Sequence, residues 1–233
     1  MTLARGPEAD ERRAVRVLRR PALQFFARVV TMCGMTSEIK GLNDLDLIHP
    51  PAALAPITAR TEALRFDMAS EPRTGALLRA LAASKPGGRL LEMGTGTGVA
   101  TAWILDGMDA RATLTSVDVN PEHQQAAHDF LGNDSRLTLV LEDGIEFLLS
   151  QPAASYDFVF ADTLPGKFEG LEECLKVVRP GGFYIIDDII PQAKWPAGHA
   201  EKVPLLVKQL AGDSRFTLLP LNWATGIVVA VRR

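Results

Sequence analysis

A glycine-rich turn is the feature of this sequence that most directly indicates chemistry. Gly94, Gly96 and Gly98 alternate with threonines directly after a short apolar run, 90–93, and a helical pattern begins at Val99. Glycine lets a ligand approach the backbone closely, and the first N–H groups of the following helix have no partner within that helix. The sequence therefore predicts a nucleotide-like ligand at this turn, with a tight turn that binds nothing as the alternative.

The residues around the turn narrow the type of ligand. A dinucleotide-binding turn needs Gly-x-Gly-x-x-Gly, but the third residue after Gly96 is Val99. Glu92 stands two residues before Gly94, where its carboxylate would repel a pyrophosphate and attract an ammonium group. The pattern favours a ligand with an ammonium group and no pyrophosphate, and it leaves a nicotinamide-dependent oxidoreductase as an alternative.

Acidic residues stand at the ends of the later apolar runs. Asp118 follows Gly94 by 24 residues, and a carboxylate there can accept hydrogen bonds from both ribose hydroxyls. Its alternative role is to cap the helix predicted from Pro121. Asp143 follows the run 137–141. A role in ligand binding and a role as the N-cap of a helix that begins at Gly144 are equally compatible with this position.

These motifs, taken in order, resemble those of the class I S-adenosylmethionine-dependent methyltransferases over residues 89–233. The turn from Glu92 to Gly98 is similar to the first motif of that family, and Arg-Pro-Gly-Gly at 179–182 is a common turn there before a strand. The resemblance implies that the cofactor is S-adenosylmethionine, that Glu92 reaches its amino group, and that Asp143 lies near the adenine. The expected cofactor-binding residues are Met68, Ser70, Glu92, Gly94, Thr95, Gly96, Gly98, Asp118, Asp143 and Gly144.

The segment 68–78, one helix before the turn, narrows the resemblance. It looks like the segment that covers the cofactor in the small-molecule O-methyltransferases related to the catechol and caffeoyl-coenzyme A enzymes. This likeness implies a small-molecule acceptor with an oxygen nucleophile. It also implies a catalytic role for Asp162 and a Mg²⁺ site formed by Asp162, Asp187 and Asp188.

Three departures from that pattern bear on the metal. Asp188 stands where the resembled enzymes have asparagine, their lysine is displaced here to Lys167, and Ala100 replaces a serine after the turn. The metal-free alternative is that Asp162 orders the mouth of the site while Asp187 and Asp188 bind local loops.

The loop 189–198 adds Trp195, a stacking platform or a hydrophobic plug. His199 follows it, either as a general base or as a solvent-facing helix start.

The alternation of apolar runs and helical stretches predicts the strands and helices that position these residues. Short apolar runs between amphipathic stretches predict an α/β fold with a Rossmann-like, seven-stranded, mostly parallel sheet and helices on both faces. The last two runs are too close for a helical crossover and predict an antiparallel edge hairpin. Strands are expected at 90–93, 114–117, 137–141, 158–161, 183–186, 216–219 and 226–231, and helices at 99–105, 121–131, 144–149, 168–178 and 200–210.

Residues 1–66 are expected to form a helical N-terminal extension, and residues 67–233 the S-adenosylmethionine-binding domain. The first 20 residues are Arg-rich and read as a mobile or surface-lying tail rather than a nucleic-acid-binding arm. Helices are expected at 22–33 and within 51–66, and another at 72–84 with Ser70 as its N-cap. The N-terminal helices are expected to cover the acceptor or to form a homodimer interface.

Composition excludes several broad classes of protein. The 233 residues are 47% hydrophobic and 23% charged, with a net charge of −3, as in ordinary globular proteins. We therefore expect no nucleic-acid partner, and no apolar run reaches the roughly 18 residues of a membrane helix. Cys33 and Cys174 read as thiols in a reducing compartment, which predicts a cytoplasmic protein. A non-catalytic nucleotide-binding module remains as a further alternative.

Overall fold

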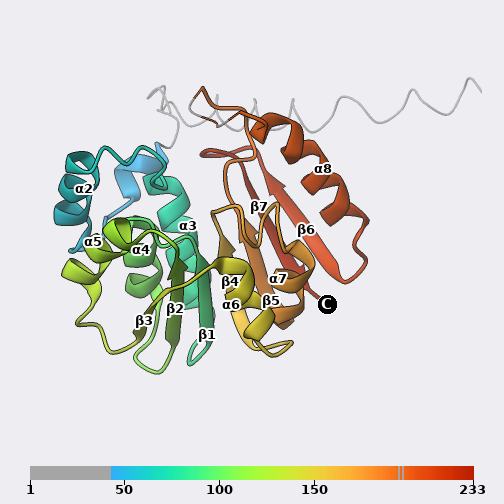
Figure 1. Cartoon of the computed structure of the whole chain (residues 1–233), viewed down its shortest axis with the longest axis horizontal. Helices are drawn as coiled ribbons and strands as arrows, with labels where there is room; N and C mark the ends of the chain where they lie inside the picture. Colours follow the sequence, from blue (N-terminus) through green and yellow to red (C-terminus); the bar gives the residue numbers. More distant parts are fainter. Residues whose placement is uncertain (1–42, 194, 196) are drawn as a thin grey trace, which may run out of the picture. The chain divides into compact units, whose positions relative to one another are not determined.

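A seven-stranded sheet runs through the computed structural model, which describes residues 43–193, 195 and 197–233 (Figure 1). The strand order is β3-β2-β1-β4-β5-β7-β6, parallel throughout except for β7, which is antiparallel to both β5 and β6. The expected Rossmann-like sheet with its antiparallel edge hairpin is therefore confirmed. The strands are β1 Arg89–Met93, β2 Thr113–Asp118, β3 Leu137–Leu141, β4 Tyr156–Ala161, β5 Val178–Ile186, β6 Phe216–Leu221 and β7 Ile227–Arg232.

Helices alternate with the first five strands, as the sequence pattern predicts. The expected tail 1–20 and the expected helix 22–33 lie outside the described residues, whereas the helix expected within 51–66 is α2. The division of the chain at residue 66 stays a prediction. The helices are η1 Asp44–Leu47 (a 3₁₀ turn), α2 Leu54–Ala63, α3 Pro72–Ala83, α4 Val99–Gly107, α5 Pro121–Leu131, α6 Gly144–Ser150, α7 Leu171–Val177 and α8 His199–Gly212.

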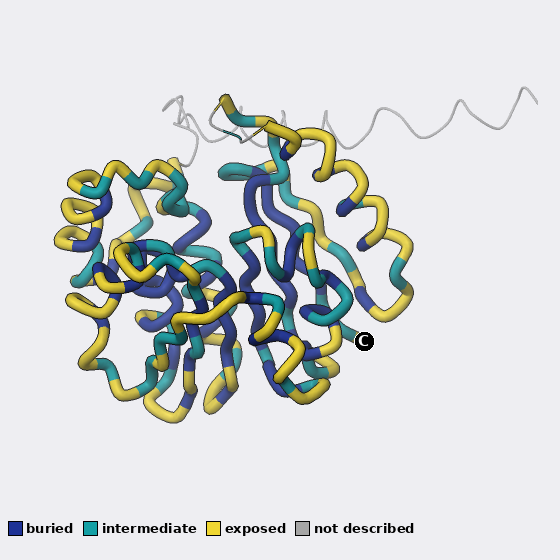
Figure 2. The backbone as a smooth tube through the Cα atoms, viewed as in Figure 1, coloured by how far each residue is buried: buried dark blue, intermediate teal, exposed yellow. Residues whose placement is uncertain are grey.

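Two hydrophobic cores cover the two faces of the sheet, because successive strand residues point to opposite sides. Leu90 and Phe160 pack with α2, α3, α4 and α5, whereas Leu91 and Val159 pack with α6, α7 and α8. All four side chains are fully buried, and Figure 2 shows the central strands as a dark band between more exposed helices. This two-sided burial explains why the parallel strands are continuous apolar runs.

The order of the strands creates the place for a site. The chain moves outward from β1 to β2 and β3, then returns to β4 on the other side of β1. Met93 pairs with Val117 on one side and with Ala161 on the other, so the residues that follow these strands emerge at one edge of the sheet. In open α/β sheets the crevice at such a reversal is where ligands bind.

The start of α3 differs from the sequence expectation. Ser70 is not the N-cap, because the N-cap is Glu71, which makes no capping hydrogen bond through its side chain. Pro72 takes the first helical position, where its missing N–H leaves no bond unmade. The Ser70 hydroxyl donates instead to Asp162 Oδ2 at 3.2 Å, so this residue faces the end of β4.

None of the helices in the described part of the chain combines the length and the apolar character needed to cross a membrane.

Candidate active site

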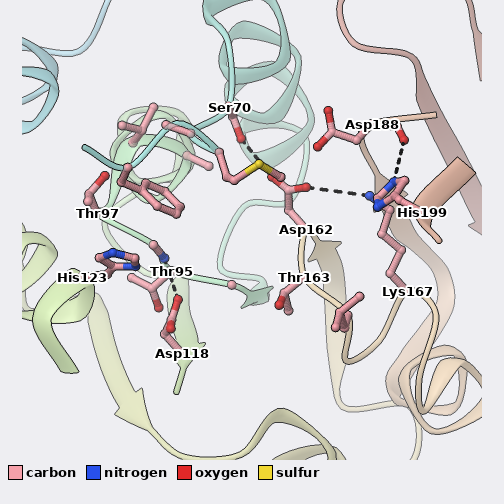
Figure 3. A pocket seen from close by; sticks show the side chains of 18 of the residues that line it. Ser70, Thr95, Thr97, Asp118, His123, Asp162, Thr163, Lys167, Asp188 and His199 are labelled. Carbon is pink, nitrogen blue, oxygen red and sulfur yellow. Dashed lines mark hydrogen bonds and ion pairs between the residues drawn. The ribbon is translucent and has the colours of Figure 1, made fainter. Parts of the chain in front are cut away.

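A cavity of about 280 Å³ opens where β1, β2, β4 and β5 end (Figure 3). Thr97, Asp118 and His123 lie at one end of it, Lys167, Asp188 and His199 lie at the other, and Ser70 and Asp162 lie between them. The cavity is lined by Phe66, Met68, Ala69, Ser70, Gly94, Thr95, Gly96, Thr97, Val99, Ala100, Asp118, His123, Asp162, Thr163, Leu164, Lys167, Phe168, Asp188 and His199.

The glycine turn forms the floor of the first end from main-chain atoms. Gly94 has φ +100°, its N–H donates to Val117 O at 2.8 Å, and a Cβ placed on it would lie 3.0 Å from Asp162 O. Gly96 has φ +51°, and a Cβ there would come within 3.0 Å of the Phe66 ring. The turn therefore depends on glycine both for its backbone conformation and for the space that it leaves.

Gly98, the third glycine of the turn, does not line the cavity. It is the N-cap of α4 with φ +92°, and its would-be Cβ lies 2.9 Å from Ala127 Cβ on α5. Because Gly98 has no side chain, α4 can pack closely against α5.

Glu92 lies beneath the turn and does not reach the cavity wall. Its side chain is fully buried, and its Oε2 accepts hydrogen bonds from Thr101 Oγ1 at 2.6 Å and from Ser116 Oγ at 2.5 Å. Thr95 is hydrogen-bonded to the same serine at 2.7 Å, so the carboxylate is linked to the turn. Among the described residues, the other oxygen, Oε1, is buried without a hydrogen-bond partner. A buried carboxylate oxygen without a partner is uncommon, and the glycine turn lies between this oxygen and the cavity.

Burial raises the pKa of Glu92 to about 8, and the hydrogen bonds from Ser116 and Thr101 oppose that rise. The charges of Asp162 and Asp118 raise this pKa further. Without a cation nearby the side chain is therefore largely protonated at neutral pH. A bound ammonium group would favour its ionised form.

Asp118 lines the cavity at the end of β2 and also braces the turn. Its Oδ2 accepts from Gly96 N at 2.7 Å and its Oδ1 accepts from Asn120 N at 2.8 Å. The helix-capping alternative is wrong, since Asn120 caps α5 through Glu122 N and His123 N. Contact between Asp118 and a ribose stays a prediction.

Asp143 and Gly144 lie outside the cavity wall. The exposed Asp143 side chain caps α6 by accepting from Ile145 N at 2.9 Å and Glu146 N at 3.2 Å, as its alternative role predicts. Gly144 is buried, and a Cβ there would lie 2.6 Å from Pro165 Cβ. The adenine contact expected of Asp143 stays a prediction.

Asp162 lies in the middle of the cavity, within reach of both ends. Its side chain is 14% exposed and lines the cavity, and its Oδ2 accepts a hydrogen bond from Ser70. Burial raises its pKa above the ordinary value for aspartate, Lys167 lowers it, and the neighbouring Asp187 and Asp188 raise it. The sequence located this residue correctly, and its catalytic role stays a prediction.

The residues expected to bind Mg²⁺ do not fit a divalent cation. Both oxygens of the buried Asp187 are already bound, Oδ2 by Thr74 Oγ1 at 2.8 Å and Oδ1 by the Thr225 hydroxyl and by Asp188 N at 2.7 Å. Asp188 has φ +57°, and its Oδ1 accepts from the Gln192 amide. Across the residues that the structure describes, no three His, Cys, Asp or Glu side chains gather as a metal site. Asp188 binds a local loop through Gln192, as the metal-free alternative expects of it, whereas Thr74 and Thr225, which bind Asp187, are distant in the chain.

Of the two residues that the sequence left open, His199 lines the second end of the cavity and Trp195 lies against His199 outside the cavity lining. His199 is 9% exposed and lines the cavity, so its solvent-facing alternative is wrong. Its ring lies 4.9 Å from the Phe168 ring and 4.5 Å from the Trp195 ring, centroid to centroid. Burial, and then the charge of Lys167, lowers the pKa of His199.

Phe66 and His123 are cavity residues that sequence reasoning missed. Their rings lie 4.5 Å apart although 57 residues separate them in the chain. His123 stands three residues after the N-cap of α5, and that position next to Asp118 is the signal that could have identified it. Phe66 follows α2 with no comparable motif, so only the fold brings it to the turn.

Comparison with known proteins gives a consistent result. Residues 91–189 match a family described as a methyltransferase domain. A protein from Mycobacterium marinum assigned as an O-methyltransferase is 32% identical over 188 residues, which cover 75% of this chain and 83% of that protein. Another so assigned, from Mycolicibacterium vanbaalenii, is 35% identical over 176 residues, which cover 70% and 77% of the two chains.

Solved structures share the fold at lower sequence identity. The O-methyltransferase TomG from Streptomyces achromogenes, which acts in tomaymycin synthesis and was solved with S-adenosylmethionine, has a TM-score of 0.69 and 22% identity. The match covers 80% of this chain and 92% of TomG. An O-methyltransferase from Bacillus cereus in complex with S-adenosylhomocysteine also has a TM-score of 0.69, with 19% identity and coverage of 80% and 93%. At these identities the likeness concerns the fold alone.

Proposed function

The chain belongs to the class I S-adenosylmethionine-dependent O-methyltransferases, and from this premise we propose that its cavity holds the cofactor over the glycine turn and a small acceptor beside Asp162. The enzyme thus transfers a methyl group from S-adenosylmethionine, and the nicotinamide-dependent alternative is not favoured. The cofactor supplies an electrophilic methyl group: the acceptor oxygen bonds to its carbon while the carbon–sulfur bond breaks and leaves its electron pair on sulfur.

The observation that carries the cofactor assignment is the buried Glu92 beneath a turn without side chains. Glu92 has one oxygen without a partner among the described residues, and the positive φ angles of Gly94 and Gly96 keep the floor of the cavity open. A carboxylate there suits the amino group of the cofactor and opposes a pyrophosphate. We infer that Asp118 receives the ribose, with Met68, Ser70 and Thr95 completing the wall.

Catalysis in this proposal depends mainly on alignment. A recess that holds both partners in line makes the transfer effectively unimolecular, which removes much of the entropic cost of bringing them together. Asp162 lies between the two ends of the cavity and accepts the proton that leaves the acceptor hydroxyl. Burial suits it to this role, because the raised pKa makes its carboxylate a stronger base than an exposed aspartate.

Calorimetric titration and a turnover assay test this function. We expect saturable binding of S-adenosylhomocysteine, no binding of NADH, and transfer of a labelled methyl group to at least one member of a panel of phenols. Carboxylic acids and amines in the same panel distinguish O-methylation from N-methylation. Binding of the cofactor with no turnover across the whole panel would favour the non-catalytic module, and binding of NADH instead would overturn the assignment.

We further propose a cytoplasmic location and a homodimer, both of which rest on the sequence pattern alone. Light scattering during size-exclusion chromatography measures the mass of the particle. We expect twice the mass of the chain, and the mass of a single chain would contradict the dimer.

A further inference from the structure

Lys167 places a positive charge inside the cavity. It lies on the segment between β4 and α7, its side chain is only 3% exposed, and its ammonium lines the second end of the recess (Figure 3). The nearest acidic oxygen is Asp162 Oδ1, 4.0 Å from Lys167 Nζ. That separation is an ion pair but is too long for a hydrogen bond.

The ammonium of Lys167 has unused hydrogen-bonding capacity. A lysine carries three N–H donors, and donors removed from water need acceptors to offset their desolvation. Within the described residues no acceptor lies within hydrogen-bonding distance of Nζ. Because the group lines a cavity, an oxygen atom of a ligand is the acceptor that it can reach.

Flat aromatic side chains surround this charge. The Phe168 ring centroid lies 5.5 Å from Lys167 Nζ, the His199 ring continues this wall of the cavity, and the Trp195 ring packs against His199. Trp195 Nε1 is itself buried without a partner among the described residues. Such a wall suits a planar ligand with a ring in contact and a polar atom at the cation.

Among the described residues, the acids around Lys167 do not gather as a ligand set for a metal ion. Mg²⁺ requires near-octahedral oxygen coordination, whereas both oxygens of Asp187 already accept hydrogen bonds from hydroxyls or a backbone N–H, and Oδ1 of Asp188 accepts from Gln192. Asp162 already faces an ammonium, so a dication beside it would be repelled by Lys167.

Building on the proposed function, we propose that Lys167, in place of a divalent metal ion, is the resident cation of this site and binds the acceptor as an oxyanion on a planar ring. The proton of the acceptor hydroxyl passes to the Asp162 carboxylate, and the oxyanion that remains is held by the ammonium. A single point charge fixes only one atom, so the aromatic wall must orient the ring.

A metal-binding measurement tests the first half of this proposal. Protein saturated with S-adenosylhomocysteine is titrated with Mn²⁺, and binding is followed by water-proton relaxation. We expect no saturable binding by the unsubstituted enzyme. Stoichiometric Mn²⁺ binding would overturn the proposal while leaving the cofactor assignment intact, and failure of the protein to bind S-adenosylhomocysteine would instead refute the proposed function.

A chromogenic phenol tests the second half. 4-Nitrophenol is added to the same complex at constant pH, and the absorbance of its anion is recorded. We expect the protein to increase the ionised fraction, and Lys167→Met to weaken binding about tenfold and remove the increase. Lys202→Met is the matched control, because Lys202 Nζ lies 5.7 Å from the same Phe168 ring but is exposed and does not line the cavity.

A double variant separates the proposal from a folding defect. Lys167→Met leaves Asp162 buried without its ion-pair partner, whereas Lys167→Met with Asp162→Asn removes both charges together. We expect the double variant to bind S-adenosylhomocysteine and to leave 4-nitrophenol in its solution ionisation state. Increased ionisation by the double variant, equal effects of Lys202→Met and Lys167→Met, or no response from the unsubstituted complex would each overturn the assignment of Lys167.

Discussion

At one end of the cavity the wall is main chain, and at the other end it is charged side chains held by distant partners. The first end consists of the glycine turn, whose geometry is fixed by φ angles and by N–H bonds to Val117 and Asp118. The second is lined by Lys167, Asp188 and His199. It adjoins Asp162 and the buried Asp187, which are fixed by hydrogen bonds that span 92 and 113 residues of the chain. Backbone shape therefore defines the cofactor end, and long-range side-chain contacts define the acceptor end.

The largest expected loss of cofactor affinity comes from a substitution in the glycine turn, at the end of the cavity that is formed by the main chain. In Gly94→Ala the new Cβ meets Asp162 O at 3.0 Å on a residue with φ +100°, so the turn must move. Strain of this kind is worth about 1–3 kcal/mol, and we expect about a hundredfold loss of affinity for S-adenosylhomocysteine by calorimetry. Gly181→Ala is the control, with φ +76° but nothing within 4 Å of the new Cβ. Equal losses in both variants would contradict the special role of the turn.

Glu92→Gln gives the next largest effect and adds a dependence on pH. The pKa of Glu92 is raised from 4.5 to about 8 in the free fold, so protonated Glu92 stabilises the protein at low pH. That stability is fully present below about 4.5 and is lost as the pH rises toward 8, and the glutamine variant removes this slope in urea titrations.

Cofactor binding should reverse the protonation of Glu92. The ammonium of the ligand favours the ionised form of Glu92, so binding at pH 7 should release a proton. Glu92→Gln removes this carboxylate and should weaken the affinity for S-adenosylhomocysteine about tenfold or more. Calorimetry in two buffers with different ionisation enthalpies measures the proton. Undiminished proton release in the variant would assign it to another group.

Asp118→Ala tests whether the Asp118 side chain both holds the glycine turn in place and binds the ribose of the cofactor. We expect about a tenfold weaker affinity for S-adenosylhomocysteine. The substitution removes the carboxylate that accepts from Gly96 N and that, in the proposed function, also accepts from the ribose. Asp143→Ala is the comparison, since Asp143 caps α6 outside the cavity wall. If only the cap is lost, stability falls by about 1 kcal/mol with affinity unchanged, whereas weaker binding would show that Asp143 contacts the adenine.

The smallest effect on cofactor affinity is expected for a substitution at the acceptor end. Thr74→Val removes the hydroxyl that donates to Asp187 Oδ2 and leaves a buried carboxylate oxygen without that donor. We expect a loss of about 1–3 kcal/mol in the free energy of unfolding, with the affinity for S-adenosylhomocysteine unchanged. Thr58→Val is the control, because Thr58 donates to Leu54 O on an exposed helix face. A large loss of cofactor affinity in Thr74→Val would mean that the two ends are not independent.

The same contrast decides how much the sequence could predict. The strands, the helices after them and the glycine turn follow from local patterns, because apolar periodicity and glycine spacing act within a few residues. Asp118 and Asp162 were also predictable, since acids at strand ends must emerge at one edge of a parallel sheet.

The acceptor end could not be predicted in this way. Its behaviour depends on which partner each side chain meets, and the contacts of Asp187 with Thr74 and Thr225 join three separate segments. The sequence therefore suggested a magnesium site from residue types that the fold uses for hydrogen bonds. Ser70 was misread as an N-cap for the same reason, because its partner Asp162 is distant in the chain.

The position of β7 has a consequence for biosynthesis. This strand is the last of the seven in chain order, yet it lies between β5 and β6. Just before it, the Thr225 hydroxyl donates to Asp187 and Gly226 O accepts from Ile189 N. A nascent chain can assemble β1, β2 and the glycine turn while translation continues, since their contacts are already synthesised. The contacts that fix the acceptor end are completed only after residues 225–232 have been synthesised, so a nascent chain completes the glycine turn before it completes the acceptor end.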